Sequence, residues 1–447
     1  MKSLISFLTF IFCLQTSLTA QNFERAYPFY TEAFADAVFT QDDGYLSAFA
    51  SRKDKFYLSL IKTDLYGDTL WTKDHDLGLT SMGNTVGTQD SEGNIYLTAD
   101  MGSQNLVKID QNGNILWSKY YQFTKQCLEL NNGFLWMATY GCYLYKLDAA
   151  TGDSLWRSDP FGNTYNYGIP TSLAFLDDGN IVITAHMYSL TINTPSTDFY
   201  KFDPNTNSIT KFELDTDIKF VIRDSEGVGN EIWSIGNLFS YNNPTHNAYF
   251  IRYSADGDII LLAEHIFDYY SGFRKLLVKD NNEIVILGSA FYTNPSYYNT
   301  ILYFMTAEGE TNWTTILGNE DHIPVDLQKA SDGGYLIGSA IKDQFDHVQP
   351  YLLKTDSLGL ITSVSDLHPT FEFSIYPNPA HDYLTIESPG IISGTISLFN
   401  SYGQKCREIA INNERSTIAV QNLNKGIYFC IINSGSAYSC KTIILGP

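Results

Sequence analysis

One pattern repeats along most of this sequence, and the repeat constrains the fold more than any other feature. The three best copies have a polar turn, an apolar strand, a variable segment, a strand ending in Lys-x-Asp, a second Gly turn and Leu-Trp, and four weaker copies follow them. The seven copies begin at Asp42, Asp90, Asn131, Asp177, Ser225, Asp280 and Ser331. Their spacing of roughly forty to fifty-five residues is typical of the four-stranded blade of a β-propeller.

A single four-stranded sheet leaves both faces uncovered, whereas sheets packed around an axis cover one another. The sequence therefore predicts an all-β fold in which residues 21–365 form a seven-bladed β-propeller. We expect a Trp at the start of the fourth strand to fill the gap between neighbouring blades. The Trp residues at this position are Trp71, Trp117, Trp156 and, in a looser copy, Trp313.

A propeller must also close, because an open ring leaves two unpaired strand edges. Phe23–Tyr30 precedes the first copy, at the place where a fourth strand would sit. We expect this segment to complete the seventh blade, and six or eight blades are the alternatives.

Composition and charge agree with an all-β protein and exclude one class of partner. Aromatic residues make up 15% of the chain, with 31 Tyr and 28 Phe, and there are 32 Gly. This mixture favours pleated strands joined by tight turns. The formal net charge of −21 repels phosphate backbones, so we expect no nucleic-acid partner.

The first twenty residues have the features of a secretory signal peptide. Lys2 provides the positive start, residues 4–14 form an apolar run, and Ala20 is a small residue at the expected cleavage point. The mature chain would begin at Gln21. Because the apolar run is too short to span a bilayer, and no other segment approaches that length, we predict no transmembrane segment.

A second pattern begins after a polar stretch that contains Pro369. We interpret residues 366–371 as a linker. The segment Phe373–Glu387, "FSIYPNPAHDYLTIE", predicts two short strands around a bend fixed by prolines. About seven short strands follow one another within residues 372–447, which favours a small Ig-like β-sandwich.

This tail resembles the type A C-terminal sorting domain of the type IX secretion system of Bacteroidetes. The resemblance rests on the entry motif, a Gly-x-Tyr step and a Lys in the last strand, which are Tyr376, Pro377, Asn378, Pro379, Gly426, Tyr428 and Lys441. It implies that the type IX secretion machinery is a partner and that the protein passes through the periplasm to the cell surface or the extracellular space. The alternative is a third packing domain without a sorting role.

One repeat, Leu147–Trp156, also resembles the blades of pyrroloquinoline-quinone-type propellers. Enzymes of that superfamily need a vicinal disulfide over the cofactor, and this sequence has no adjacent cysteines. The resemblance therefore implies the blade pattern alone, and we expect no cofactor.

Five cysteines remain after the expected cleavage. Cys430 and Cys440 are equidistant from Gly435, so a hairpin turning at that glycine would place them opposite each other. A disulfide between them and two separate thiols are equally compatible with the sequence.

Motifs that identify a catalytic or metal site do not occur. The sequence has no H-E-x-x-H and no G-x-S-x-G, and its eight His residues are scattered. The turn that contains Asp110, Asn112 and Asn114 has the spacing that begins a calcium loop, but hairpin geometry explains it equally well. We therefore predict neither catalytic residues nor a metal site.

The variable segments of the fourth, fifth and sixth copies are rich in Tyr, Asn and Pro. We place them between the second and third strands of their blades, where they would converge on one face of the ring. The candidate binding residues are Tyr241, Tyr292, Tyr297 and Tyr298, because flat rings and amides suit sugar or peptide recognition. Solvent-exposed decoration of long hairpins is the alternative.

Three functions are compatible with this sequence. The first is a non-catalytic surface module that binds or adheres to a glycan or a protein. The second is an extracellular glycan-degrading enzyme with its active site at the mouth of the propeller, which converging carboxylates at the axis would favour. The third is a scaffold that contacts only other surface proteins.

Overall fold

A computed structural model describes most of the chain. The described residues are 22–28, 30, 33, 36–80, 85–99, 105–121, 127–162, 166–189, 196–216, 220–238, 247–265, 270–279, 282–293, 296–317, 322–342, 347–361, 373–389, 394–400, 405–411, 413–434 and 437–446. The predicted signal peptide and the predicted linker lie outside these residues. Contacts divide the chain into two units, Met1–Thr362 and Ser363–Pro447.

The first unit is a ring of seven antiparallel four-stranded sheets, as the repeat predicts. Blade one is β2 (Ala37–Gln41), β3 (Gly44–Arg52), β4 (Phe56–Thr63) and β5 (Thr69–His75). Blade two is β6 (Thr85–Gln89), β7 (Ile95–Ala99), β8 (Leu106–Ile109) and β9 (Ile115–Lys119). Blade three is β10 (Cys127–Asn131), β11 (Phe134–Thr139), β12 (Tyr143–Asp148) and β13 (Ser154–Arg157).

The remaining blades have the same order with longer strands. Blade four is β14 (Asn166–Phe175), β15 (Ile181–Ser189), β16 (Ser196–Asp203) and β17 (Ser208–Phe212). Blade five is β18 (Phe220–Val228), β19 (Glu231–Leu238), β20 (Ala248–Ser254) and β21 (Ile259–His265). Blade six is β22 (Tyr270–Val278), β23 (Ile284–Thr293), β24 (Ser296–Met305) and β25 (Thr311–Leu317). Blade seven is β26 (His322–Lys329), β27 (Tyr335–Lys342), β28 (Val348–Thr355) and β1 (Phe23–Ala26).

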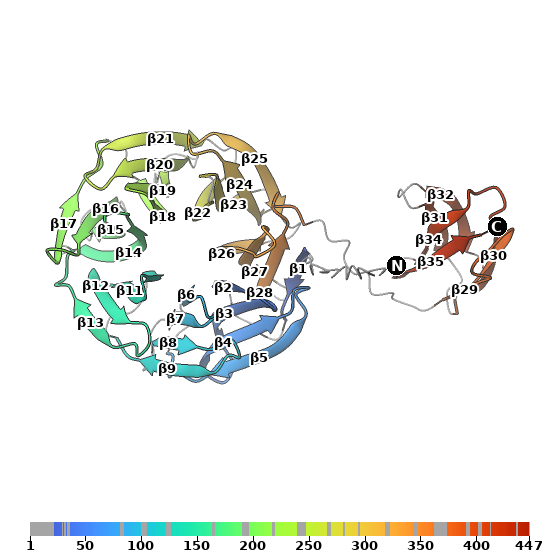
Figure 1. Cartoon of the computed structure of the whole chain (residues 1–447), viewed down its shortest axis with the longest axis horizontal. Helices are drawn as coiled ribbons and strands as arrows, with labels where there is room; N and C mark the ends of the chain where they lie inside the picture. Colours follow the sequence, from blue (N-terminus) through green and yellow to red (C-terminus); the bar gives the residue numbers. More distant parts are fainter. Residues whose placement is uncertain are drawn as a thin grey trace, which may run out of the picture. The chain divides into compact units, whose positions relative to one another are not determined.

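The first strand of each blade lies innermost and the fourth lies at the rim (Figure 1). The first strands contact one another in order around the ring, and β26 contacts β2 to complete the circle. Strand β1 pairs antiparallel with β28, with Phe23 opposite Lys354. The prediction that the N-terminal segment completes the seventh blade is confirmed for Phe23–Ala26.

The apolar core of the ring lies between blades rather than within them. The cluster shared by blades one and two, for example, contains Leu46 and Leu58 from one sheet and Leu97 and Ile109 from the other. Each pair of neighbouring blades shares one such cluster. Because each sheet is covered by its two neighbours, the ring supplies the burial that one blade lacks.

Where the repeated Trp is present, it connects its blade to the next, as predicted. Trp71 of blade one packs on Gly113 of blade two, where an added Cβ would lie 2.5 Å from the ring. Trp117 packs on Gly152 of blade three in the same way. In blade six the indole Nε1 of Trp313 donates a hydrogen bond of 3.2 Å to the carbonyl of Leu358.

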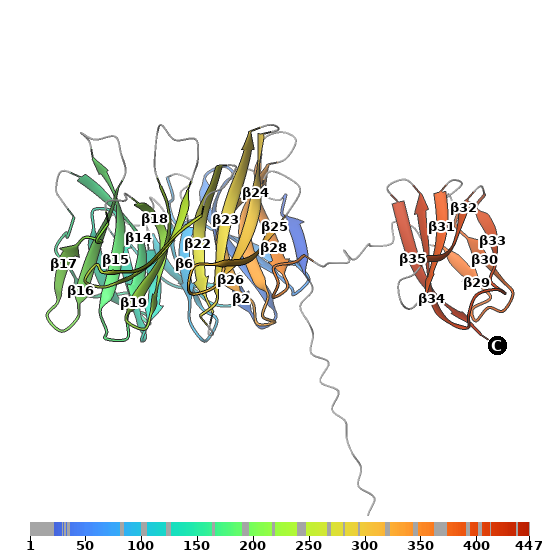
Figure 2. The same ribbon diagram turned by 90° about the horizontal axis from the view of Figure 1, so that it is seen from above.

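The strands of the propeller run between its two faces (Figure 2). Because the strands are antiparallel and consecutive, the turns between first and second strands share one face with the turns between third and fourth strands. The other face carries the connections between second and third strands and the crossings between blades. We call it the connection face; in blades four, five and six its connections between second and third strands are residues 190–195, 239–247 and 294–295.

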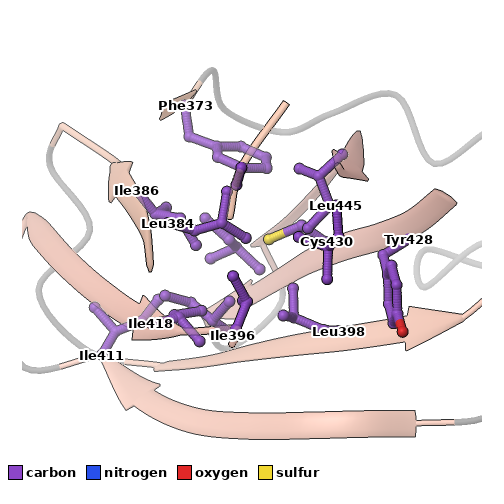
Figure 3. Packing of buried hydrophobic residues seen from close by; sticks show 14 residues of the cluster. Phe373, Leu384, Ile386, Ile396, Leu398, Ile411, Ile418, Tyr428, Cys430 and Leu445 are labelled. Carbon is purple, nitrogen blue, oxygen red and sulfur yellow. The ribbon is translucent and has the colours of Figure 1, made fainter. Parts of the chain in front are cut away.

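The second unit is a sandwich of seven strands, which agrees with the predicted strand count. One sheet has the order β29 (Ser374–Tyr376), β30 (Tyr383–Glu387) and β33 (Arg415–Ala419). The other has the order β32 (Lys405–Ile411), β31 (Gly394–Asn400), β34 (Gly426–Ser434) and β35 (Ala437–Leu445). Figure 3 shows the core between them, with Leu384 and Ile386 from the first sheet and Leu398 and Cys430 from the second. In the described part of the chain, no helix is long and apolar enough to cross a bilayer.

Candidate functional site

Four consecutive blades have an irregular innermost strand. The register against the second strand shifts between Pro170 and Ser172 in β14, and between Ile222 and Asp224 in β18. It shifts again after Phe273 in β22 and after Pro324 in β26. Bulges of this kind re-aim side chains and occur often beside functional sites. The four shifts bring Ser172, Asp224, Lys275 and Asp326 to equivalent positions around the axis.

Charged side chains from four blades gather at this level. The ammonium of Lys275 lies 3.4 Å from Oδ2 of Asp224. The charge of Asp224 is the largest cause that raises the pKa of Lys275, with further contributions from Asp326 and Glu129. A single lysine is therefore surrounded by carboxylates that lie far apart in the sequence. We call Glu129, Asp224, Glu226, Lys275 and Asp326 the axial cluster.

Three carboxylates of the axial cluster bond to the backbone of the next blade. Oδ2 of Asp224 accepts from the amide of Leu276 at 2.9 Å, and Oε2 of Glu226 accepts from the amide of Val278 at 2.9 Å. Oδ2 of Asp326 accepts from the amide of Val38 at 3.0 Å. The first strand of a blade has no strand on its axial side, so these carboxylates satisfy its edge amides.

Burial inside the ring also changes the acidity of the cluster. Burial raises the pKa of Glu129 to about 7, and the positive charge of Lys275 only partly opposes this effect. Burial likewise raises the pKa of Glu226 to about 7, although the hydrogen bond from Val278 lowers it. The pKa of Asp326 is raised for the same reason. Both glutamates therefore keep their protons to a higher pH than an exposed carboxyl group does.

Two arginines stand beside the axial cluster. Arg223 and Arg274 are the residues at which the registers of β18 and β22 shift, and both are exposed. Nε of Arg274 donates a hydrogen bond of 3.3 Å to Oγ of Ser289. Arg223 lies close enough to His186 to contribute to the low pKa of that ring, about 4, of which burial is the main cause. Each arginine precedes its partner in the cluster by one residue, so both lie nearer the connection face.

The four tyrosines predicted to bind a ligand are only partly described. Tyr241 lies outside the described residues. The backbones of Tyr292 and Tyr297 are paired across β23 and β24, and Tyr298 is paired with Phe291. The three predicted connections do join second and third strands on one face. The role of these tyrosines in binding stays a prediction.

The turn considered as a calcium loop has a structural explanation. Oδ1 of Asp110 accepts hydrogen bonds from the amides of Asn112 and Asn114, at 2.9 and 2.8 Å. Asp64 and Asp356 hold their turns with the same pair of bonds. Within the described residues, no group of three or more His, Cys, Asp or Glu side chains is arranged to hold a metal ion.

Of the two alternatives for Cys430 and Cys440, the observed register favours separate thiols. Ser434 pairs with Ala437, so Cys430 stands opposite Lys441 while Cys440 stands opposite Ile431. The expected turn, centred on Gly435, was wrong by one residue, and a shift of one residue separates the two cysteines. Cys430 is a buried thiol in the core of the sandwich rather than half of a disulfide.

In the second unit the motif Tyr376–Pro379 contacts the last strand. The Asn378 side chain accepts from the amide of Ile444 at 2.8 Å and donates to the carbonyl of Thr442 at 3.2 Å. Asn378 thereby pairs with the edge of β35 as a strand would. The peptide bonds before Pro377 and Pro379 are both cis.

The other motif residues belong to the same sandwich. The hydroxyl of Tyr428 donates to the carbonyl of Asn424 at 2.9 Å. Gly426 begins β34 with a φ of 147°, which favours glycine. The ammonium of Lys441 lies 5.4 Å from the centre of the Phe373 ring. The motif residues thus occupy structural positions at the entry and in the second sheet.

The axial cluster was not among the predicted site residues. Its members lie in strands that precede the turns of the repeat, and the sequence analysis named no candidate residue there. In blade five we also expected a turn near Ser225, whereas Ser225 lies inside β18 and the turn falls at Gly229, where φ is 63°. Charged residues inside strands of an otherwise apolar repeat were the signal for the cluster.

Comparison with known proteins identifies the second unit. Residues 374–446 match the family model described as secretion system C-terminal sorting domain. None of the curated proteins is similar to this sequence. The predicted sorting domain is confirmed, and it implies contact with the type IX secretion machinery.

Several solved structures are similar to this chain at low sequence identity. BamB from Moraxella catarrhalis is 13% identical with a TM-score of 0.38, over 72% of this chain and 86% of that one. The WD40 repeats of RRP9 are 9% identical with a TM-score of 0.49, over 74% and 97%. A protein of unknown function from Dyadobacter fermentans is 11% identical with a TM-score of 0.43, over 75% and 98%.

These TM-scores lie below 0.5, and the propeller rests on the strand pairing described above. A sorting domain of this family directs its cargo to the cell surface or the extracellular space. The chain is therefore a secreted seven-bladed β-propeller that carries a type IX secretion C-terminal sorting domain.

Proposed function

We propose that this protein is an exported, non-catalytic module that binds a glycan through the connection face of its propeller. One observation carries the proposal: the connections between second and third strands in blades four to six lie on the same face, and the innermost strands of blades five and six are bulged and bear exposed arginines. These connections and the strand ends beside them are rich in Tyr and Asn. Such residues bind sugars and peptides with little loss of side-chain entropy.

The bonding of the axial carboxylates favours binding over catalysis. Asp224, Glu226 and Asp326 each accept a hydrogen bond from a backbone amide of the next blade. Because these bonds satisfy strand edges, the fold itself requires the three carboxylates. A catalytic pair would need carboxylates that are available to a substrate.

Binding by the mature full-length protein to an array of neutral and acidic glycans tests this proposal. We expect retention of a subset of glycans, without any change in their length. The tyrosine variants Tyr292→Ala and Tyr297→Ala should weaken that binding. If the protein retains no glycan but captures a purified surface protein, the proposed ligand class is wrong. If it binds neither a glycan nor a protein, the proposal is overturned.

A glycan-degrading enzyme is the second candidate, and one observation favours it. Glu129 shares the axis with other carboxylates, and burial raises its pKa to about 7, which suits a general acid at neutral pH. In this case the protein would shorten a polysaccharide, and Glu129→Gln would abolish that activity. Release of reducing ends by the wild type but not by this variant would replace the binding proposal with catalysis.

A further inference from the structure

The second sheet of the sandwich is apolar on both of its sides. The side chains that point inward, such as Leu398 and Tyr428 in Figure 3, fill the core. On the outward side, Ile427, Phe429 and Ile444 are 52%, 40% and 45% exposed. An antiparallel sheet with one side in water usually alternates apolar and polar side chains, so this outward side departs from the common pattern.

The register of the strands brings these outward side chains together. Ile427 of β34 stands opposite Ile444 of β35, and Phe429 of β34 stands opposite the half-buried Phe399 of β31. Side chains directly opposite each other have Cβ atoms about 4.5–5.5 Å apart, and residues two apart on one strand share a side. We call Phe399, Ile427, Phe429 and Ile444 the apolar face, because they form one continuous patch across three strands.

The outward side of the first sheet has a different chemistry. Arg415 and Thr417 are exposed on β33, and Nε of Arg415 lies 3.6 Å from Oε1 of Glu387 on β30. The apolar face is therefore a local property of β31, β34 and β35 and not of the sandwich as a whole.

The edge of β35, next to the apolar face, is occupied. The amide of Ala380 donates to the carbonyl of Ile444 at 2.8 Å, and the amide of Gly446 donates to the carbonyl of Ala380 at 3.0 Å. Asn378 bonds to the amide of Ile444 and to the carbonyl of Thr442 on the same edge. Because these groups are already paired, another strand cannot add to this part of β35. A partner that binds here therefore contacts the face of the sheet and not its edge.

We propose that the apolar face docks transiently on an apolar surface of a protein of the secretion machinery. The family match implies that this unit contacts the machinery, and the apolar face is a patch that such a protein can cover. Stable interfaces bury about 20–30 residues on each side, which is many more than these four. The size of the patch therefore suits a contact that forms and is released during export, and it argues against a permanent dimer of this chain.

The charge of the sorting unit favours a protein over a lipid surface. Residues 374–446 contain five basic and four acidic side chains, so the net charge of −21 lies almost entirely in the rest of the chain. Stable binding to a bilayer usually takes an apolar anchor together with a polybasic patch. The near-neutral unit has little charge to attract it to anionic lipids, whereas an apolar protein surface needs no such attraction.

Phe429→Thr and Ile444→Thr in the full chain test this proposal, because threonine keeps the strand propensity while removing the apolar surface. Each should weaken docking about fivefold, equal to about 1 kcal/mol, since roughly half of each side chain is left to bury. In a host that carries the type IX secretion machinery, we expect secretion of each variant to fall to about a fifth when the protein competes with the wild type. Tyr383→Thr is the matched control, because Tyr383 is 54% exposed on the first sheet, and its secretion should not change.

A photocrosslinker tests the contact directly. p-Benzoylphenylalanine placed at position 429 of the full chain should crosslink to a protein of the secretion machinery, and the crosslink should be lost in a host without that machinery. The same group at position 383 should give no such crosslink. Equal crosslinking from both positions, or secretion of both threonine variants at the level of the wild type, would overturn the inference.

Two other occupants of the apolar face have their own tests. If the mature full-length protein binds vesicles of phosphatidylethanolamine and phosphatidylglycerol and Phe429→Thr abolishes that binding, the face binds lipid and the inference is wrong. If ultracentrifugation shows a dimer that Phe429→Thr dissociates, a second copy covers the face and the inference is equally wrong. Hydrogen exchange across β34 and β35 should show that the variants are folded, and Ile427→Thr replaces any variant that is not. Because the face belongs to the sorting unit, none of these results bears on the proposed glycan binding.

Discussion

Phe23 of β1 packs directly on Gly67, in the turn between β4 and β5 of blade one. A Cβ added at Gly67 would lie 2.7 Å from ring carbon Cδ2 of Phe23. Phe23 pairs with Lys354 just as Trp71 pairs with Lys62 and Trp117 with Lys108. In the seventh blade Phe23 therefore takes the place of the repeated Trp, and its contact with blade one closes the ring.

A glycine comparison tests this closure. Gly67 and Gly133 both have positive φ, 80° and 76°, but a Cβ at Gly133 would meet no atom within 4 Å. Alanine strains the backbone equally at both positions, and at Gly67 it also collides with Phe23. We expect Gly67→Ala to lower the free energy of unfolding by about 1–3 kcal/mol more than Gly133→Ala.

Urea denaturation followed by Trp fluorescence measures the difference, because all six Trp residues lie in the propeller. Phe23→Ala should also destabilise the ring, by about 3–5 kcal/mol, since it removes a buried aromatic side chain. Equal losses for the two glycine variants would show that Phe23 does not close the ring.

The ring was predictable from sequence because its signals are local. The turn at Asp110 and the Lys-x-Asp ending of β8 recur at a regular spacing, so each blade can be recognised from its own segment of sequence. The N-terminal strand was predictable by elimination, because one blade lacked its fourth strand. The aromatic that closes the ring, Phe23, differs from the repeated Trp and was not recognised as its equivalent.

The axial cluster was not predictable in the same way. Glu129, Asp224, Lys275 and Asp326 are brought together only by the closure of the ring. They share no motif, and their spacing reflects the blade length rather than any chemistry. The register of the hairpin that contains Cys430 was predicted wrongly for another reason: the composition of a hairpin does not reveal a shift of one residue.

A buried ion pair in blade seven allows a test of charge burial. The ammonium of Lys354 is fully buried and donates to both oxygens of Asp332, at 2.9 and 2.7 Å, while the carboxylate is 21% exposed. Burial lowers the pKa of Lys354. Asp332→Asn leaves the buried charge without its counterion and should cost about 3–5 kcal/mol.

Lys354→Met removes the buried charge instead and should cost clearly less, because Asp332 reaches water. Urea denaturation of the two variants under the same conditions measures the contrast. If Lys354→Met is as destabilising as Asp332→Asn, then the attraction between the two groups outweighs the cost of burying the lysine.

The axial glutamates predict a pH dependence of stability. Glu129 has a pKa of about 7 in the folded protein against an ordinary value of 4.5, so between these values the folded state holds more protons than the unfolded state. The contribution of Glu129 to stability is therefore complete below about pH 4.5 and is lost as the pH rises to about 7.

Glu129→Gln mimics the protonated form, so its stability relative to the wild type should rise between pH 5 and pH 8. Glu226→Gln should behave in the same direction, because burial raises that pKa to about 7 as well. Thermal melts of the three proteins across this range measure the effect. A stability difference that does not change with pH would contradict the raised pKa values of the two glutamates.

The contact of Asn378 with β35 predicts a defect confined to the sorting unit. Asn378→Ala removes one donated and one accepted hydrogen bond and should destabilise that unit by about 1–3 kcal/mol. Asn378→Asp keeps the acceptor for the amide of Ile444 and should be affected less. Hydrogen exchange at the amide of Ile444 reports the loss, and Trp fluorescence of the propeller should stay unchanged.

The amount of protein secreted should follow the stability of the sorting unit, so Asn378→Ala should be secreted less than Asn378→Asp. If Asn378→Ala reaches the medium or the cell surface as well as the wild type does, the machinery does not depend on how the motif joins the last strand.

The pairing of β1 with β28 also sets an order of events during synthesis. The first strand emerges early and waits without its neighbour until residue 355 has been translated. Only then are residues 374–446, which carry the export address, added to the chain. A truncated product that lacks the last blade also lacks the sorting domain. Chains with an incomplete ring are therefore not exported.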